Sequence, residues 1–167
     1  TYVSGHSPYV VDYENELISV EEDWHKNTGD AIAAQLREAG IKVKRTVLPG
    51  STFWNDWTKY PFSATEWNMR PLGVQIFSLA YKSGVAWNET ALNNADLDAA
   101  LAEALSISDA EKRKVVMEKI EKIMQDEGVL IQPYWRSLYR HTAVDVRGCE
   151  QHPMIEHHHY KWWKAQA

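Results

Sequence analysis

The segment at residues 66–73, EWNMRPLG, places several ligand-binding side-chain types in one short stretch. Trp67 offers a flat aromatic face for stacking, Asn68 offers a hydrogen-bonding amide, and Met69 can line an apolar wall. Arg70 can clamp a carboxylate or a phosphate through two parallel hydrogen bonds. Loops at the carboxyl ends of strands commonly bind ligands in α/β folds. We therefore interpret the segment as a candidate binding loop, although a core Trp67 and a solvated Arg70 would account for the same residues.

The next loop, residues 83–94, carries a second candidate pair, Trp87 and Asn88. The chain has 8 tryptophans in 167 residues. A large flat ring with a polar N–H suits both packing and the lining of a ligand cleft. We therefore expect Trp87 and Asn88 to be further ligand-binding residues, with packing against another part of the protein as the other explanation.

A histidine cluster near the C-terminal end suggests a different chemistry, metal binding. His152 is followed by the adjacent His157, His158 and His159, and imidazole nitrogens bind zinc and nickel. Adjacent residues of an extended chain point to alternate sides, so three neighbours rarely reach one ion. The favoured interpretation is a structural role with no metal bound. A nickel- or zinc-binding module built on these histidines stays open as the alternative.

Signatures of catalysis do not occur in the sequence. The acidic run at residues 21–23 has no nucleophile beside it, and Cys149, the single cysteine, lacks the spacing of a Cys-His-Asn arrangement. No Gly-Xaa-Ser-Xaa-Gly elbow, phosphate-binding loop or dinucleotide fingerprint is found. We therefore expect no enzyme, no catalytic residue and no cofactor. A small hydrolase, the third possibility, would need a buried carboxylate or thiol pair in a pocket.

Helices and strands must position these loops, and the first clear ones lie at residues 28–48. Thr28 or Asp30 can cap a helix that runs to Ala39, and Gly40 can end it in a left-handed conformation. Residues 41–48 then alternate between apolar and basic side chains, which predicts a half-buried strand with its apolar positions inward.

Shorter elements are predicted between residues 49 and 81. Ser51 can cap a short helix with three aromatic residues, which Pro61 ends. Residues 62–67 read as a strand that leads into the candidate binding loop. Residues 74–81 read as a helix with one apolar face.

Two strong helices follow the second loop. Asn94 or Ala95 begins the first, whose apolar stripe repeats at helical spacing. Ser108 and Glu111 form the pattern of a capping box at the start of the second, and Gly128 ends it.

The remaining segments are strand-like or weakly patterned. Residues 129–135 and 138–146 read as strands, residues 1–9 allow a short strand, and residues 14–24 are acidic without a clear period. The alternation of strands and helices predicts an α/β fold with a mixed sheet flanked by helices.

Overall charge and hydropathy exclude several classes of partner. A net charge of -5 argues against nucleic-acid binding and against an electrostatic membrane anchor. No apolar run approaches the roughly 20 residues needed to span a bilayer. Residues 1–9 lack the apolar region of a secretory signal, so we expect a mature chain or a piece of a longer one.

Four segments resemble family-five extracellular solute-binding proteins of bacterial ABC importers, which take up peptides, opines or nickel. They are AIAAQL followed by GIKV at residues 31–43, NNADLDAAL at 93–101, DAEKR at 109–113 with the helix after it, and the strand-like 129–135. Trp67 also stands where the family places a tryptophan that lines the cleft. The resemblance covers most of residues 30–148, and residues 67–73 with 87–89 resemble one sub-branch.

This resemblance implies the C-terminal lobe of a type II periplasmic-binding-protein fold over residues 1–148, with residues 149–167 as a tail that packs on this lobe or on the absent one. It implies a periplasmic receptor that traps a small molecule or peptide against an N-terminal lobe, absent here, and delivers it to an ABC permease in the inner membrane. Many peptide-binding members carry an aspartate a few residues after this tryptophan, and this chain offers Arg70 in that neighbourhood instead. That difference argues against an ordinary peptide and favours a ligand that presents a carboxylate or a phosphate. The solute implied is an oligopeptide, an opine or a related anionic compound.

Overall fold

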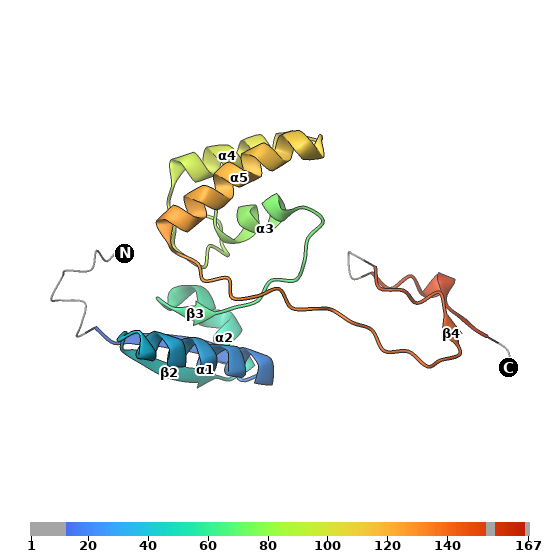
Figure 1. The fold of residues 1–167 in the computed structure, drawn as a ribbon, viewed down its shortest axis with the longest axis horizontal. Helices are drawn as coiled ribbons and strands as arrows, with labels where there is room; N and C mark the ends of the chain where they lie inside the picture. Colours follow the sequence, from blue (N-terminus) through green and yellow to red (C-terminus); the bar gives the residue numbers. More distant parts are fainter. Residues whose placement is uncertain (1–12, 153–155, 166–167) are drawn as a thin grey trace.

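The computed structural model describes residues 13–152 and 156–165. Its main sheet contains β1 (Asn15–Val20), β2 (Val43–Leu48) and β3 (Ser63–Ala64) in the order β2-β1-β3, all parallel. Helix α1 (Asp23–Glu38) covers one face of this sheet, and α2 (Gly50–Asp56) with the short η1 (Trp57–Lys59) lies against the other (Figure 1). The predicted α/β class, a sheet flanked by helices, is therefore confirmed.

The central strand β1 is the main element that sequence patterning missed. Leu17, Ile18, Ser19 and Val20 are each at most 1% exposed. A strand buried on both faces shows no alternation of polar and apolar residues, because neither face meets water. The strand predicted at residues 1–9 lies outside the described part of the chain.

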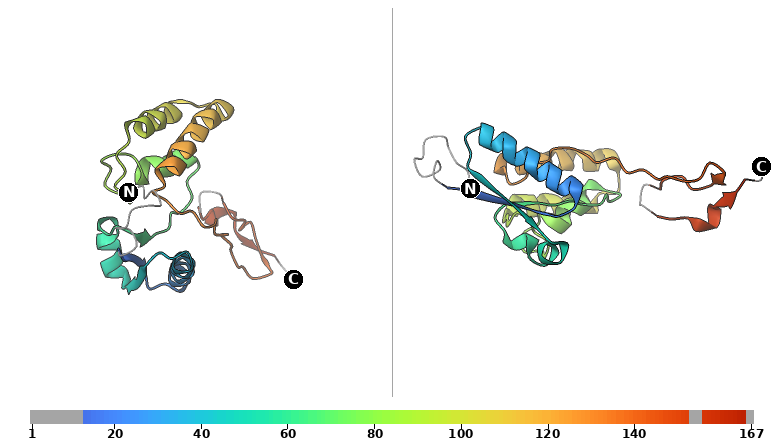
Figure 2. Two further views of the ribbon diagram at one scale, coloured as in Figure 1. Left: turned by 60° about the vertical axis from the view of Figure 1, so that its left-hand side comes forward. Right: turned by 90° about the horizontal axis from the view of Figure 1, so that it is seen from below.

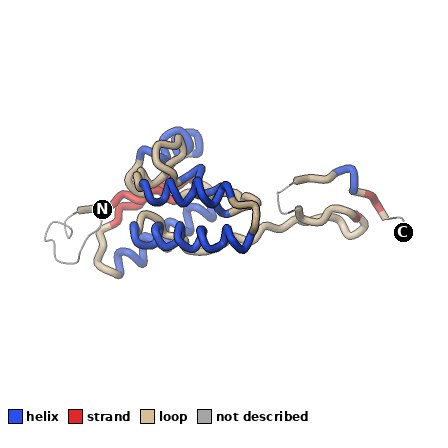
Figure 3. Tube along the Cα trace, turned by 90° about the horizontal axis from the view of Figure 1, so that it is seen from above, coloured by secondary structure: helices blue, strands red, loops and turns tan. Residues whose placement is uncertain are grey.

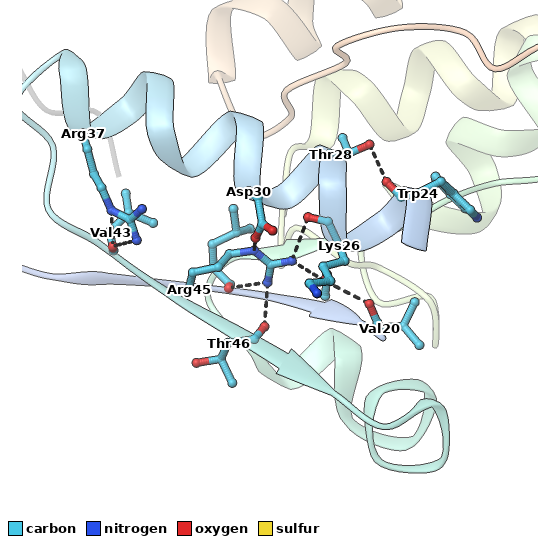
Figure 4. A network of polar contacts seen from close by, with 11 residues as sticks. Val20, Trp24, Lys26, Thr28, Asp30, Arg37, Val43, Arg45 and Thr46 are labelled. Atoms are coloured by element: carbon cyan, nitrogen blue, oxygen red, sulfur yellow. Dashed lines mark hydrogen bonds and ion pairs between the residues drawn. The ribbon is translucent and has the colours of Figure 1, made fainter. Parts of the chain in front are cut away.

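Helix α1 begins earlier than predicted, and neither Thr28 nor Asp30 caps it. The Thr28 hydroxyl donates to the Trp24 carbonyl within the helix (2.7 Å). Asp30 instead pairs with Arg45 of β2 across 3.0 Å, as Figure 4 shows. The Arg45 guanidinium passes close over Gly29, where a Cβ atom would lie 2.6 Å from it. Gly29 therefore permits the arginine to tie α1 to the sheet.

Strand β2 is shorter than predicted, and only part of its apolar pattern points inward. Val43 is 5% exposed and packs with Leu17, but Ile41 and Val47 are 42% and 39% exposed. Ile41 precedes the strand, and Val47 lies on a sheet edge with a neighbouring strand on one side only. The predicted strand at residues 62–67 is likewise reduced to β3.

A second body consists of α3 (Gly73–Ala80), α4 (Ala95–Ser106) and α5 (Ala110–Glu127), which share one apolar core. Figures 1 and 2 show these helices grouped apart from the sheet and α1. The predicted stripes are confirmed at most positions, although Leu105 is 56% exposed. The core side chains that α4 and α5 contribute are Leu97, Ala100, Leu101, Ala104, Val116, Ile120 and Met124.

The ends of these helices agree with the sequence at two positions and differ at one. Asn94 caps α4 by accepting from the Leu97 N–H (2.9 Å), and Gly128 ends α5 with a left-handed φ of 61°. Ser108 does not cap α5, because Asp109 accepts from the Lys112 N–H instead (2.9 Å). Both residue types are good caps, and the pattern places them one residue apart.

The strands predicted at residues 129–135 and 138–146 are wrong for the described chain, which has no strand pairing at residues 129–145 and pairs only at the last predicted position, Val146. A strand needs a neighbour that completes its hydrogen bonds, and none lies beside this segment. Figure 3 shows the chain leaving the helices toward a small end structure. There β4 (Val146–Arg147) pairs antiparallel with β5 (Trp163–Lys164) beyond the short η2 (His159–Lys161). No helix among the described residues is long and apolar enough to cross a membrane.

Candidate ligand-binding surface

The residues best suited to bind a ligand lie at the carboxyl ends of the strands of the parallel sheet. Because β1, β2 and β3 are parallel, the segments that follow them emerge at the same edge. Glu22 and α1 follow β1, α2 follows β2, and the candidate binding loop with Trp67 follows β3. The loop predicted to bind ligand therefore lies where α/β folds commonly bind one.

Four tryptophans form a continuous row, here called the aromatic strip: Trp54, Trp57, Trp67 and Trp87. Successive ring centroids are 6.2 Å, 6.1 Å and 5.9 Å apart. The strip runs from α2 to the loop before α4, and its end members Trp54 and Trp87 are 43% and 49% exposed. The structure thus brings Trp67 and Trp87 together, whereas sequence analysis did not place Trp54 and Trp57 in the site. Their i, i+3 spacing on a helical turn was the available signal.

Glu89 organises the middle of the strip, and it was not among the predicted site residues. Its carboxylate accepts hydrogen bonds from the Thr65 hydroxyl (2.6 Å), the Trp67 Nε1–H (3.1 Å) and the Tyr81 hydroxyl (2.8 Å). Burial, with Glu89 close by, strongly raises the pKa of Tyr81, so this phenol stays a protonated donor. The Trp67 N–H is therefore already bonded to Glu89 and is not offered to a ligand. This bond holds the Trp67 ring in a fixed position.

The three residues after Trp67 form an accessible loop. Asn68 and Met69 are exposed, and Arg70 is half-buried. The Arg70 Nη1 donates to the carbonyls of Asn68 (3.0 Å) and Met69 (3.2 Å). These two contacts keep the guanidinium beside the loop that sequence analysis selected.

Asn88 holds the second loop together. Its Nδ2 donates to the carbonyls of Lys82 (3.2 Å) and Leu92 (2.8 Å), and its Oδ1 accepts from the Thr90 hydroxyl (3.1 Å). The amide therefore serves the loop that presents Trp87, which lies next to it in the sequence.

A cluster of polar and charged side chains lies beside the strip, where α1 and β3 meet the chain after α5. The Arg136 guanidinium is 4.2 Å from the centre of the Trp24 ring, and its Nη2 is 3.3 Å from the Glu66 carboxylate. Burial raises the pKa of Glu66, and Arg136 opposes that shift. His25 is 1% exposed, and burial lowers its pKa and favours the neutral ring.

The aromatic strip is an open wall and not an enclosed pocket. A shallow hollow of about 380 Å³ lies elsewhere, between α1 and the segment after α5. Its lining includes Thr28 and Tyr134, whose hydroxyls are 2.7 Å apart. A ligand on the strip would meet protein on one side, so the surface can hold a flat or apolar group but cannot enclose it.

No protein-family model and no curated protein sequence matches the chain. Several solved structures do match its fold. The oligopeptide-binding protein AppA from Bacillus subtilis, solved with a nonapeptide, is 17% identical with a TM-score of 0.71, covering 92% of this chain and 32% of that one. The murein tripeptide binding protein MppA from Escherichia coli is 16% identical with a TM-score of 0.67, covering 98% of this chain and 33% of that one.

A nickel-binding structure matches in the same way. NikZ from Campylobacter jejuni, in complex with Ni(L-His), is 18% identical with a TM-score of 0.62, covering 70% of this chain and 25% of that one. The chain spans about a third of the length of the first two structures. It therefore has the fold of one part of the solute-binding proteins for peptides and nickel complexes.

Proposed function

We propose that this chain is one lobe of the solute-binding component of an ABC importer, and that it captures a small anionic solute, such as an opine or an oligopeptide, without catalysing a reaction. The observation that carries the proposal is the fold, shared over 92% of the chain with an oligopeptide-binding protein. In this proposal residues 1–148 form the C-terminal lobe and residues 149–167 a tail. The receptor acts in the periplasm, closes with an N-terminal lobe, and passes its solute to a permease.

The exposed segment after α5 supports the proposal that an N-terminal lobe packs against this chain. Ile131, Trp135 and Tyr139 are 53%, 88% and 76% exposed along one unpaired stretch. Apolar side chains in such a row usually meet another protein surface. We place the N-terminal lobe of the same receptor against this stretch.

The aromatic strip and its loop would form one wall of the cleft. Trp87, half-exposed and tilted at 54° to the ring of Trp67, provides the outer aromatic face. Arg70 binds the anionic group of the solute, while Asn68 and Met69 contact its remainder. Trp67 supports these contacts from behind, and Asn88 maintains the loop that carries Trp87.

Replacing Trp87 tests this wall. The solute is first identified by native mass spectrometry of the full-length receptor purified from its own cells. Trp87→Ala in that receptor should weaken binding of this solute about tenfold, because an exposed aromatic contact is worth roughly 1–2 kcal/mol. Leu105→Ala, at a residue of α4 that is 56% exposed and lies outside both the strip and the stretch after α5, is the control for lost apolar surface. Equal affinities of the Trp87 variant and the parent would count against the proposed wall.

A metal-binding module remains a second candidate, favoured by one arrangement in the tail. His152, Glu156 and His158 each bring a possible ligand atom within 4.8 Å of the others. His158 Nε2 is 2.7 Å and His152 Nδ1 3.8 Å from the Glu156 carboxylate, and two imidazoles with a carboxylate suit zinc. His157 lies 3.1 Å from Arg140 instead, so the adjacent histidines do not converge, as alternation predicted.

Titration with zinc or nickel separates this candidate from solute binding. If the tail is the functional site, replacing His152 and His158 together with alanine should lower metal affinity at least tenfold, since two ligands are lost. The same variant should leave solute affinity unchanged if the aromatic strip is the functional site. His141→Ala, a histidine outside the three-residue group, is the matched control.

A further inference from the structure

Glu22, His25 and Glu66 come together from two separate parts of the chain. Glu22 and His25 follow β1 and begin α1, whereas Glu66 follows β3. One possible ligand atom from each residue lies within 4.8 Å of the other two. The parallel sheet brings these residues together, since the ends of β1 and β3 share one edge. The group is separate from the histidines of the tail and from the loop residues proposed to contact a solute.

His25 is the unusual member of this group. The residue is 1% exposed, and neither ring nitrogen has a hydrogen-bond partner among the described residues. The Nδ1 atom is 3.8 Å from a Glu22 oxygen, too far for a hydrogen bond. A buried polar atom without a partner costs about 1–3 kcal/mol, so it usually has a water, ion or ligand beside it. Here two carboxylates face the same space.

The side-chain types of these three residues fit a divalent transition-metal ion as the partner of the His25 ring. A neutral imidazole and two carboxylates are common ligands of zinc, and imidazole also suits nickel and cobalt. Metal–ligand bonds of about 2.0–2.2 Å in a tetrahedral site place ligand atoms roughly 3.3–3.6 Å apart. Atoms that lie within 4.8 Å of one another would therefore have to move closer by up to about 1 Å. Glu22 is 56% exposed and provides a flexible, accessible side of the site.

Arg136 explains how the carboxylates are balanced without an ion. Its Nη2 pairs with Glu66 across 3.3 Å while its guanidinium packs on Trp24, whose ring contacts that of His25 at 3.6 Å. The Arg136 side chain is 43% exposed, so it can leave Glu66 without leaving a buried charge unpaired. A cation at this place would compete with the guanidinium for the same carboxylate.

We propose that Glu22, His25 and Glu66 bind one divalent transition-metal ion, with Arg136 as a displaceable counter-ion of Glu66. The site would lie where the sheet, α1 and the chain after α5 meet. A bound ion would connect α1 to the loop after β3. The proposal does not depend on solute binding by the aromatic strip, since it uses none of the residues assigned to that wall.

A cobalt titration tests the site with the whole chain. The parent for all measurements carries alanine at His152, His157, His158 and His159, which removes the tail as a competing site. Cobalt should bind with one equivalent, followed by its visible absorption and by calorimetry. His25→Ala should weaken binding at least tenfold, because a metal ligand is lost. His141→Ala is the control and should leave binding unchanged.

Replacing Arg136 gives a second result of opposite sign. Arg136→Gln should tighten cobalt binding about fivefold, because it removes a competing positive charge. If His25→Ala fails to fold, Glu22→Gln at the exposed ligand should weaken binding at least tenfold in a folded protein. The proposal is overturned if the parent binds no cobalt, if folded ligand variants bind as the parent does, or if Arg136→Gln weakens binding. If the full-length receptor bound no solute while this chain still bound cobalt, the result would count against the proposed function alone.

Discussion

Replacing Glu89 with alanine is expected to lower the free energy of unfolding by about 3 kcal/mol. The change removes one acceptor group and leaves three donors without it, from Thr65, Trp67 and Tyr81. Tyr81 is only 4% exposed, so its hydroxyl cannot readily find water instead. Each buried donor left unpaired costs about 1–3 kcal/mol, and the three do not add fully because the cavity can admit some water.

Urea unfolding followed by circular dichroism measures this change. Glu89→Gln keeps an acceptor oxygen of similar reach and should cost less than half as much. Glu118→Ala, at an exposed position of α5, should change stability by no more than about 0.5 kcal/mol. An effect of Glu89→Ala as small as that of Glu118→Ala would mean that Glu89 does not organise the strip.

The helices of the second body could be predicted because each has one solvent-exposed face and one buried face. Leu97, Leu101 and Ile120 are buried while the adjacent residues 96, 102 and 119 are exposed, and this contrast produces the helical period. Strand β1 lacks such a contrast, since α1 covers one of its faces and Phe53 of α2 the other. The unpaired chain after α5 shows the reverse case, in which strand-like residues have no strand beside them.

The candidate site could be located from sequence, but the roles of its residues could not be assigned. Aromatic and polar residues in two loops indicated Trp67 and Trp87, which do meet. Glu89 joins groups up to 24 positions away in the sequence. Helical and strand periodicity relate only residues that are close in the sequence, so they could not predict these contacts. His25 follows an acidic run that reads as solvated surface, and only the fold reveals that its ring is buried.

The largest expected effect on binding concerns the partner lobe. We expect the 167-residue chain alone to bind the solute at least about a hundredfold more weakly than a receptor that contains both lobes. Binding pockets usually bury about 70–90% of a ligand's surface. The aromatic strip presents one wall, with Trp54 and Trp87 still 43% and 49% exposed, so the opposite side of a bound solute would remain in water.

The size of this effect follows from a small area. A hundredfold loss corresponds to about 2.7 kcal/mol, which the burial of roughly 110 Å² of apolar surface supplies at 25 cal/mol per Å². One further wall on a small solute covers at least that much. Calorimetry of both proteins with the same solute provides the measurement, and Trp87→Ala in each shows whether both bind through the strip. Equal affinities would mean that one lobe forms the whole site, because a second wall that contacts the ligand must change the free energy of binding.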